Sequence, residues 1–124
     1  MRRVLVVDDS LLIREVARMS LESDGGFVVA TAESGAQGLA AAVADRPDAI
    51  LLDVVMPEMD GPATVRALRA RGETRGIPVV LVTGRDQEED RRAFTELGVA
   101  GVISKPFDAA ALAAQVRDVL GWGT

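Results

Sequence analysis

The chain has 124 residues and a net charge of −5, with 48% hydrophobic and 27% charged residues, which is typical of one globular domain. It contains no cysteine and no histidine, which excludes disulfide bonds, thiolate metal sites and histidine-based catalysis. The acidic balance argues against direct binding of nucleic acid. The apolar run at residues 4–7 is too short for a signal peptide or a membrane span, so a cytoplasmic protein is expected.

In chain order, short apolar runs alternate with amphipathic segments. The runs predicted as strands are residues 4–7, 27–31, 49–52, 79–82 and 99–104. A helix is predicted after each of them: from Ser10 to the glycines at 25–26, from a cap at Ser34 to Ala44, from Pro62 to Arg71, from Asp86 to Gly98, and from a cap at Asp108 onward.

This strict alternation predicts an α/β fold with a parallel five-stranded sheet and helices on both faces of the sheet. The crossover between successive strands is expected to be right-handed. Ligands of such sheets bind beyond the carboxyl ends of the strands. The residues just after each strand are therefore the candidates for a functional site.

Three carboxylates, one hydroxyl and one ammonium follow these strands. Asp8 and Asp9 follow the first strand, Asp53 the third, Thr83 the fourth and Lys105 the fifth. A single aspartate at such a place is as often a helix cap, but three together repel one another unless a cation is bound. A set of oxygen ligands favours Mg²⁺, which commonly bridges to phosphate oxygens. Thr83 and Lys105 are candidates to bind other oxygens of that phosphate.

Asp53 is the candidate phosphoryl acceptor, because a carboxylate can act as a nucleophile and the chain has no glycine-rich loop for a nucleotide phosphate. Lys105 is the single lysine beside 13 arginines. We interpret it as a position that requires a compact ammonium rather than a forked guanidinium. The alternative is chance survival of one lysine codon in a GC-rich genome.

The sequence resembles the response-regulator receiver domain, the phosphoacceptor of two-component signalling, and looks most like chemotaxis-type single-domain receivers. The resemblance covers residues 1–124 as one receiver domain. It rests on four motifs in order: Val-Val-Asp-Asp-Ser at 6–10, Leu-Asp-Val-Val-Met-Pro-Glu-Met-Asp-Gly at 52–61, Val-Thr-Gly at 82–84 and Ser-Lys-Pro-Phe at 104–107. It implies a flavodoxin-like (βα)5 three-layer sandwich with strand order 2-1-3-4-5.

The resemblance implies that Asp53 accepts a phosphoryl group from a phosphohistidine of a sensor histidine kinase or phosphotransfer protein, with Mg²⁺ as cofactor. Thr83 and Lys105 would bind the phosphoryl oxygens, and the Lys105–Pro106 peptide bond would be cis. The implied metal ligands are Asp9 and Asp53 directly, Asp8 through water, and the backbone carbonyl of Val55.

The resemblance also implies a signalling domain rather than an enzyme, one that assists only its own phosphorylation and dephosphorylation. A downstream effector protein or domain would read its change of conformation, without nucleic acid binding or membrane insertion; a phosphorylation-dependent homodimer is the other option. The expected reading surface is the helix after Thr83, the strand at 99–104 and the last helix, with Ala110 and Ala114 facing outward. Three alternatives remain: the chain is a complete regulator, a receiver that belongs to a larger protein, or a degenerate receiver that only binds partners. The intact set of site residues argues against the third.

Four positions depart from the pattern of many receivers. Val102 stands where an aromatic residue usually reports phosphorylation, and Gly84 stands where alanine is common. Val55 and Arg85 flank the expected approach of water to phosphorylated Asp53. Neither side chain is a carboxylate or an amide that orients water, which predicts slow self-dephosphorylation.

Two alternatives come from other functional classes. A small aspartate-nucleophile phosphatase would carry an Asp-x-Asp pattern after its first strand, whereas the chain has Asp8-Asp9-Ser10 there. A flavin-binding flavodoxin would need aromatic side chains to stack on the ring, and only 3% of the residues are aromatic. Turnover of a small phosphoester would favour the first, and a yellow colour the second.

Overall fold

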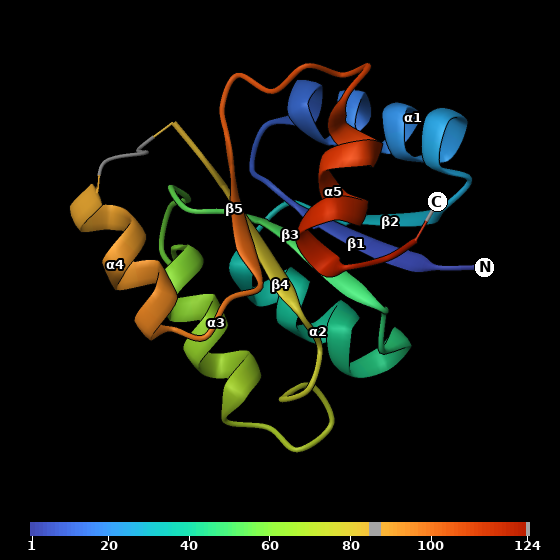
Figure 1. The fold of residues 1–124 in the computed structure, drawn as a ribbon. Coiled ribbons are helices and arrows are strands. Elements are labelled where there is room, and N and C mark those ends of the chain that lie inside the picture. Colours follow the sequence, from blue (N-terminus) through green and yellow to red (C-terminus); the bar gives the residue numbers. More distant parts are fainter. Residues whose placement is uncertain (85–87, 124) are drawn as a thin grey trace.

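The computed structural model describes residues 1–84 and 88–123, and within them five strands alternate with five helices (Figure 1). The strands are β1 (Arg3–Val7), β2 (Val28–Ala32), β3 (Ala49–Asp53), β4 (Val79–Thr83) and β5 (Gly101–Ser104). The helices are α1 (Leu11–Gly25), α2 (Gly35–Asp45), α3 (Gly61–Arg69), α4 (Glu88–Glu96) and α5 (Leu112–Leu120).

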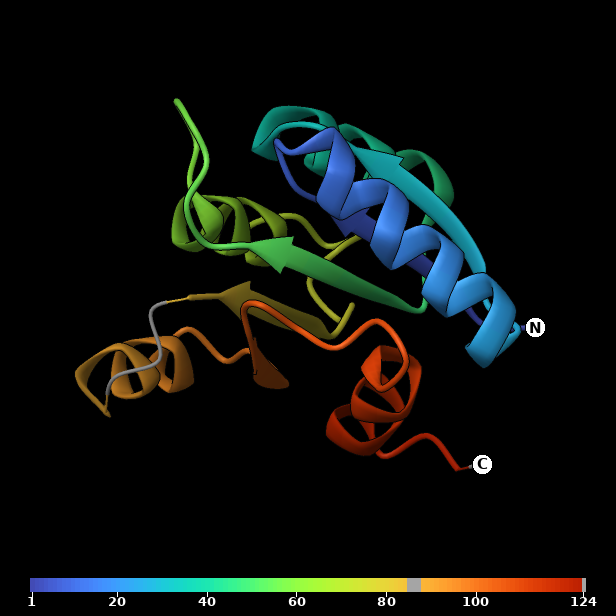
Figure 2. The ribbon, with the colours of Figure 1, turned by 90° about the horizontal axis from the view of Figure 1, so that it is seen from above.

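The strands form one sheet in the order β2-β1-β3-β4-β5, and every neighbouring pair is parallel. Figures 1 and 2 show α1 and α5 on one face of this sheet and α2, α3 and α4 on the other. All residues of β3 and β4 are buried, as expected for strands covered on both faces. The predicted three-layer α/β sandwich and its strand order are confirmed.

Alternating side chains of the strands build a separate core on each face of the sheet. In β1, Leu5 and Val7 belong to the core beneath α2, α3 and α4, whereas Val4 and Val6 belong to the core beneath α1 and α5. Val102 of β5 packs against the first of these cores. The sheet thus lies between two apolar layers, and its carboxyl edge projects from between them.

Serine caps start two of the helices: the predicted cap at Ser34 is confirmed, and Ser10, predicted only as a helix start, is a cap too. Ser10 accepts a hydrogen bond of 3.3 Å from the N–H of Ile13, and Ser34 accepts one of 3.1 Å from the N–H of Gln37. Each bond satisfies one of the amide groups that a helix leaves unpaired at its start. The beginning of α1 directly follows β1, so the first cap also lies beside the carboxyl edge of the sheet.

The predicted cap at Asp108 is wrong. The Asp108 carboxylate accepts a hydrogen bond of 2.9 Å from the N–H of Ala110, two residues further on, which is the pattern of a turn rather than of a helix cap. Helix α5 begins only at Leu112, after Ala111, and has no side-chain cap. Ala110 therefore lies in a turn, but it is exposed, as is Ala114 on α5, so the predicted outward direction of both is confirmed.

Two predicted boundaries shift by two residues. Helix α3 ends at Arg69 instead of Arg71, and the following turn is held by the Arg69 guanidinium, whose Nη1 donates to the carbonyls of Arg75 and Ile77. Strand β5 begins at Gly101 instead of residue 99. The predicted helix start at Asp86 lies outside the described residues.

The end of the chain packs at the amino ends of the strands. The Trp122 ring meets Phe27 edge-on, with ring centroids 5.6 Å apart. The guanidinium carbon of Arg2 lies 4.4 Å from the Trp122 ring centroid, a cation–π contact. These contacts close the amino edge of the layer that α1 and α5 form.

No helix in the described part of the chain is both long enough and apolar enough to span a bilayer.

Candidate functional site

The carboxyl ends of four strands bring the predicted site residues to one edge of the sheet. Thr83 at the end of β4 pairs with Ser104 at the end of β5, and the Thr83 carbonyl accepts a hydrogen bond of 2.8 Å from the N–H of Lys105. Asp53 ends β3 and pairs with Val82. The parallel register therefore places the hydroxyl, the ammonium and the central carboxylate on adjacent strands.

Asp8, Asp9 and Asp53 form a compact group that we call the acidic cluster. Each offers a carboxylate oxygen, and these three oxygens lie within 4.8 Å of one another. Asp8 and Asp53 are only 3% and 6% exposed, whereas Asp9 is exposed. The cluster thus has a buried floor and opens to solvent beside Asp9.

Lys105 bridges the two buried carboxylates. Its Nζ lies 2.9 Å from Oδ2 of Asp8 and 3.0 Å from Oδ1 of Asp53, with 23% of the side chain exposed. Three carboxylates and one ammonium leave a formal charge of −2 in a partly buried place. A divalent cation would neutralise that charge.

The surroundings raise the pKa values of Asp53 and Lys105. Burial raises the pKa of Asp53 above its ordinary value and the charge of Asp8 adds to this, against the hydrogen bonds from Lys105 and from the backbone of Val55. Burial works to lower the pKa of Lys105, but its hydrogen bonds and ion pairs with Asp8 and Asp53 outweigh this and raise it. Lys105 therefore stays a cation at neutral pH.

The donor atoms of the acidic cluster suit a hard divalent cation. All three side chains offer oxygen, the ligand type that Mg²⁺ prefers, and the chain has no His or Cys that would favour a softer metal. Val55 lies two residues beyond Asp53 with its side chain 62% exposed. Its backbone carbonyl as a metal ligand stays a prediction.

A close approach of two backbones shapes the loop that leaves the acidic cluster. The Gly61 N–H donates 2.9 Å to the carbonyl of Val54, which returns the chain to the end of β3. A Cβ atom at Gly61 would lie 2.8 Å from the carbonyl oxygen of Asp53, closer than real contacts allow. Glycine at this position therefore fixes the loop between Asp53 and α3.

Thr83 and the segment after β5 complete the site. Thr83 is 2% exposed and borders the acidic cluster through its backbone bond to Lys105. The Lys105–Pro106 peptide bond is cis, as predicted. Arg85, which is expected to flank the approach of water to Asp53, lies outside the described residues.

Arg14 of α1 is a neighbour of the site that sequence reasoning misses. Its Nη1 donates a hydrogen bond of 2.8 Å to the carbonyl oxygen of Asp8, and the side chain is only 12% exposed. The signal in the sequence is an arginine four residues after the Ser10 cap. It is weak, because an arginine at a helix start normally extends into solvent.

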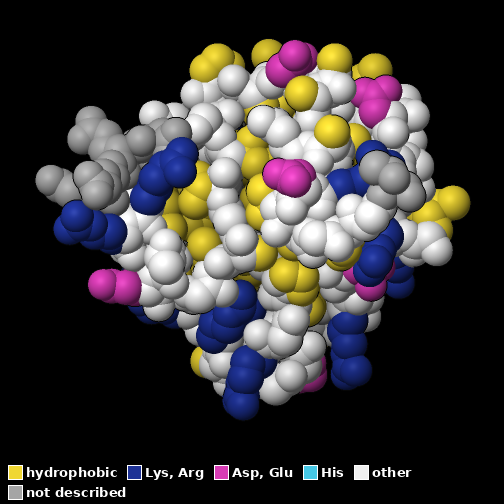
Figure 3. All heavy atoms as spheres, in the orientation of Figure 1, with side chains coloured by type: hydrophobic (Ala, Val, Ile, Leu, Met, Phe, Trp, Pro, Cys, Tyr) yellow, Lys and Arg dark blue, Asp and Glu magenta, His cyan; other side chains and the backbone are white. Residues whose placement is uncertain are grey.

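An apolar hollow opens beside Lys105. Its volume is about 340 Å³, and it is lined by Leu12, Ile13, Val16, Lys105, Pro106 and Phe107. Leu11 and Leu12 are 66% and 72% exposed, which is unusual for leucine. Figure 3 shows apolar side chains along this side of the molecule, over α1 and the segment between β5 and α5.

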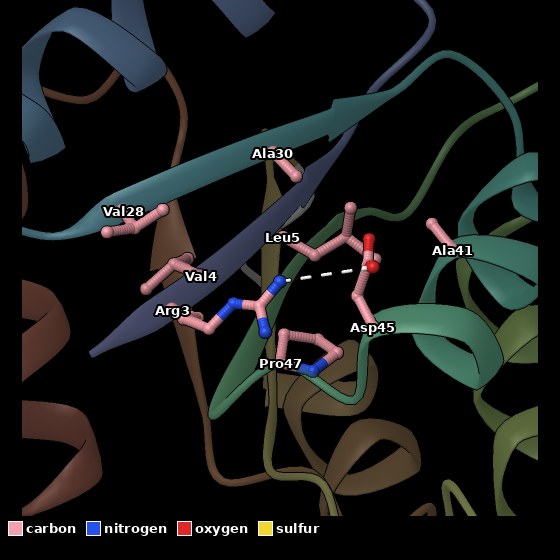
Figure 4. Close-up of a pocket in the computed structure, with 8 residues that line it drawn as sticks. All are labelled: Arg3, Val4, Leu5, Val28, Ala30, Ala41, Asp45 and Pro47. Atoms are coloured by element: carbon pink, nitrogen blue, oxygen red, sulfur yellow. Dashed lines mark ion pairs between the residues drawn. The ribbon is translucent and has the colours of Figure 1, made fainter. Parts of the chain in front are cut away.

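The hollow at the opposite edge of the sheet is too small for an organic ligand. Figure 4 shows it between β1, β2 and α2, where Arg3 and Asp45 form an ion pair of 3.9 Å. Its volume of about 30 Å³ has room for one or two water molecules.

Comparison with known proteins identifies the family. The family model described as the response regulator receiver domain matches residues 4–117. The chain belongs to the response regulator receiver domain family. This receiver thus belongs to a family of signalling domains rather than of enzymes in the ordinary sense.

Relatives of this receiver include longer proteins. The response regulator MprA of Mycobacterium ulcerans (strain Agy99) is 40% identical over 118 residues, which are 95% of this chain and 50% of MprA. MprA of Mycobacterium avium (strain 104) matches with the same identity and coverage. The chain thus spans about half the length of these curated relatives.

Solved structures similar to this receiver are receivers of several kinds. Chemotaxis protein CheY4 of Vibrio cholerae has a TM-score of 0.89 and 34% identity, covering 96% of this chain and 98% of CheY4. The signal receiver domain of a signal transduction histidine kinase from Syntrophus aciditrophicus has a TM-score of 0.83 and 33% identity, with 98% and 91% covered. The fold therefore matches over nearly the whole chain.

Proposed function

We propose that this receiver accepts a phosphoryl group on the Asp53 carboxylate in a Mg²⁺-dependent reaction, and that residues 1–124 act as one receiver domain. The observation that carries the proposal is the buried Asp53 carboxylate, held 3.0 Å from the Lys105 ammonium inside the acidic cluster. Three neighbouring carboxylates attract a metal ion, and the Lys105 ammonium beside them attracts an anionic group. The site can therefore bind both at once.

The proposed reaction forms one bond and breaks another. A carboxylate oxygen of Asp53 attacks the phosphorus of a phosphohistidine on a histidine kinase or phosphotransfer protein, the P–O bond forms, and the P–N bond breaks. The imidazole leaves with the electron pair of that bond. Asp53 must be ionised for the attack. Burial raises the pKa of this carboxyl, and the hydrogen bond from Lys105 works against that effect by favouring the ionised form.

Each neighbour of Asp53 has a proposed part in that transfer. Asp9 and Asp53 would hold Mg²⁺ directly, with Asp8 acting through water and Val55 through its carbonyl, and the metal would supply positive charge for the phosphoryl oxygens. Lys105 would move its hydrogen bond from the Asp53 carboxylate to a phosphoryl oxygen. The Thr83 hydroxyl would donate to another, which changes the packing around β4 and transmits the switch.

The test is uptake of phosphoryl groups from acetyl phosphate, a small donor that needs no partner protein. With Mg²⁺ the mass of the chain is expected to rise by one phosphoryl group, and peptide mapping should place it on the segment that contains Asp53. In excess EDTA the gain should disappear. Labelling on another segment, or equal labelling without divalent metal, contradicts the proposed site.

A slow loss of the phosphoryl group is expected once Asp53 is phosphorylated. Val55 presents an exposed branched side chain without a hydrogen-bonding group, so it does not orient a water molecule toward the phosphorus. Positioning of this kind changes rates by about ten-fold or more. The measurement is the decay of the phosphorylated species, followed by mass spectrometry. It compares the parent chain, the single variant Val55→Asn and the double variant Val55→Asn, Arg85→Glu.

Both Val55 variants are expected to decay faster than the parent chain, and the double variant fastest. Val28→Asn, at an exposed valine of β2, serves as the matched control and should leave the decay unchanged. Loss within seconds in the parent chain, or an unchanged decay in the double variant, contradicts this account of water access.

For partners, we propose a histidine kinase or phosphotransfer protein as donor and an effector protein or domain as reader, in the cytoplasm. Leu12 is exposed and lines the hollow beside Lys105, and its neighbour Leu11 is exposed too, which supports the approach of a protein donor from the side of α1. The reading surface would be α4, β5 and α5. An open hollow of about 460 Å³ there is lined in part by Val102, Gln115 and Asp118.

Replacing Ala114 by Glu is expected to disrupt the reading surface alone. Ala114 is exposed on α5, so the longer charged side chain is tolerated in the fold but prevents close approach of a partner helix or of a second receiver. The measurements are the shift in oligomeric state on phosphorylation and binding of an effector. Ala36→Glu on the opposite layer is the control. If assembly and binding are unchanged in Ala114→Glu, the alanines of α5 reflect the general alanine content of the chain and do not form a binding surface.

A further inference from the structure

Arg14 connects the end of β1 with the turn before α2. Its Nη1 donates 2.8 Å to the carbonyl oxygen of Asp8, and its Nη2 lies 3.9 Å from Oε2 of Glu33. Glu33 is held in turn by Gln37, whose Nε2 donates 3.2 Å to Oε1 of Glu33. The Arg14 side chain is only 12% exposed and so belongs to the wall of the site rather than to the surface.

The carbonyl that Arg14 holds is part of the peptide unit between Asp8 and Asp9. Because a peptide unit is planar, holding its oxygen fixes the orientation of the plane, and with it the position of the Asp9 nitrogen and Cα from which the side chain extends. Asp8 has further anchors, since its N–H donates to the Ala32 carbonyl and its Oδ1 accepts from the N–H of Ser10. In the part of the chain that the structure describes, the Asp9 carboxylate has no such protein partner.

We propose that Arg14 is a positioning residue for the acidic cluster. By fixing the peptide plane between Asp8 and Asp9, it sets the distance from the Asp9 carboxylate to the other two and thereby the affinity for a divalent cation. The proposal rests on the proposed role of the cluster as a Mg²⁺ site. Arg14 contacts a backbone oxygen and none of the reacting atoms, so it acts through Asp9.

Two effects of Arg14 on a cation have opposite signs, and this makes them separable. Its positive charge repels Mg²⁺, so charge alone predicts tighter binding once the guanidinium is removed. Its planar fork contacts the Asp8 carbonyl through one nitrogen and Glu33 through the other, an arrangement that an ammonium cannot reproduce. Positioning therefore predicts weaker Mg²⁺ binding in both a neutral and a lysine variant.

The experiment measures the dissociation constant of Mg²⁺ by calorimetry in the whole chain, without any phosphodonor. Arg14→Gln and Arg14→Lys are each expected to raise it by about ten-fold, the effect typical of groups that orient metal ligands. Arg18→Gln is the matched control, because Arg18 lies one turn further along α1 and pairs with Glu15 and Glu22 at 2.8 Å, away from the acidic cluster. It should change the constant by less than about two-fold.

Unchanged or tighter Mg²⁺ binding in Arg14→Gln overturns the proposal, as does a parent-like constant in Arg14→Lys. Should Arg14→Gln lose its helical circular dichroism spectrum, Arg14→Lys decides. A parent chain that binds no Mg²⁺ overturns the metal site itself, which separates failure of the proposed function from failure of the positioning role.

Discussion

The Asp53→Asn variant is expected to take up no phosphoryl group from acetyl phosphate under conditions in which the parent chain is labelled. Asn keeps the shape of the side chain and an oxygen that can accept the hydrogen bond from Lys105 Nζ. In the parent chain this nitrogen lies 3.0 Å from Oδ1 of Asp53. The amide has no anionic oxygen to attack phosphorus, so the nucleophile alone is removed.

The comparison needs a carboxylate whose loss leaves the acidic cluster intact. Asp118→Asn provides it, because Asp118 is exposed on α5. Intact-mass spectra in Mg²⁺ should show one added phosphoryl group in the parent chain and in Asp118→Asn, and none in Asp53→Asn. Circular dichroism checks that all three chains are folded. Labelling of Asp53→Asn at the parent rate would move the acceptor to another residue.

Lys105→Arg is expected to slow phosphorylation by about ten- to hundred-fold while Mg²⁺ binding persists. The Nζ atom fits between two carboxylate oxygens at 2.9 and 3.0 Å, and a guanidinium is too wide and too flat to replace it there. Loss of one charge-assisted hydrogen bond to the phosphoryl group accounts for that range of rates.

Lys105→Met separates charge from shape at the same position. Removal of the ammonium takes a cation away from the acidic cluster, so Mg²⁺ is expected to bind more tightly than in the parent chain although phosphorylation is slow. Arg71→Lys is the control for an exchange of these two residue types on the surface. A Lys105→Arg chain with parent-like labelling and parent-like assembly would refute the inference drawn from the single lysine.

The convergence of the site could be predicted because it follows from topology. Parallel strands place their carboxyl ends on one edge, so Asp8, Asp53 and Lys105 had to meet once the strands were recognised. The pattern was strong, since β3 and β4 are apolar at nearly every position. The roles of these residues in phosphoryl transfer stay predictions for the experiments above.

Other features could not be read from the sequence, for physical reasons. The alanines at 109–111 favour a helix by intrinsic propensity, but the Asp108 carboxylate closes a turn with Ala110 and delays α5. The contact of Arg14 with Asp8 depends on which backbone carbonyl faces α1, and sequence spacing does not determine that. Contacts made only in the folded chain therefore determine both the start of α5 and the placement of the Arg14 side chain.

The packing of Trp122 determines what fluorescence can report in this molecule. It is the only tryptophan and the chain has no tyrosine, so emission excited near 295 nm comes from this ring alone. The ring lies against Phe27, just before β2, and under Arg2, just before β1, at the edge of the sheet opposite the acidic cluster. Its emission is therefore expected to report whether Trp122 stays packed against the core beneath α1 and α5, and thus unfolding, and to change little when Mg²⁺ or a phosphoryl group binds at the acidic cluster.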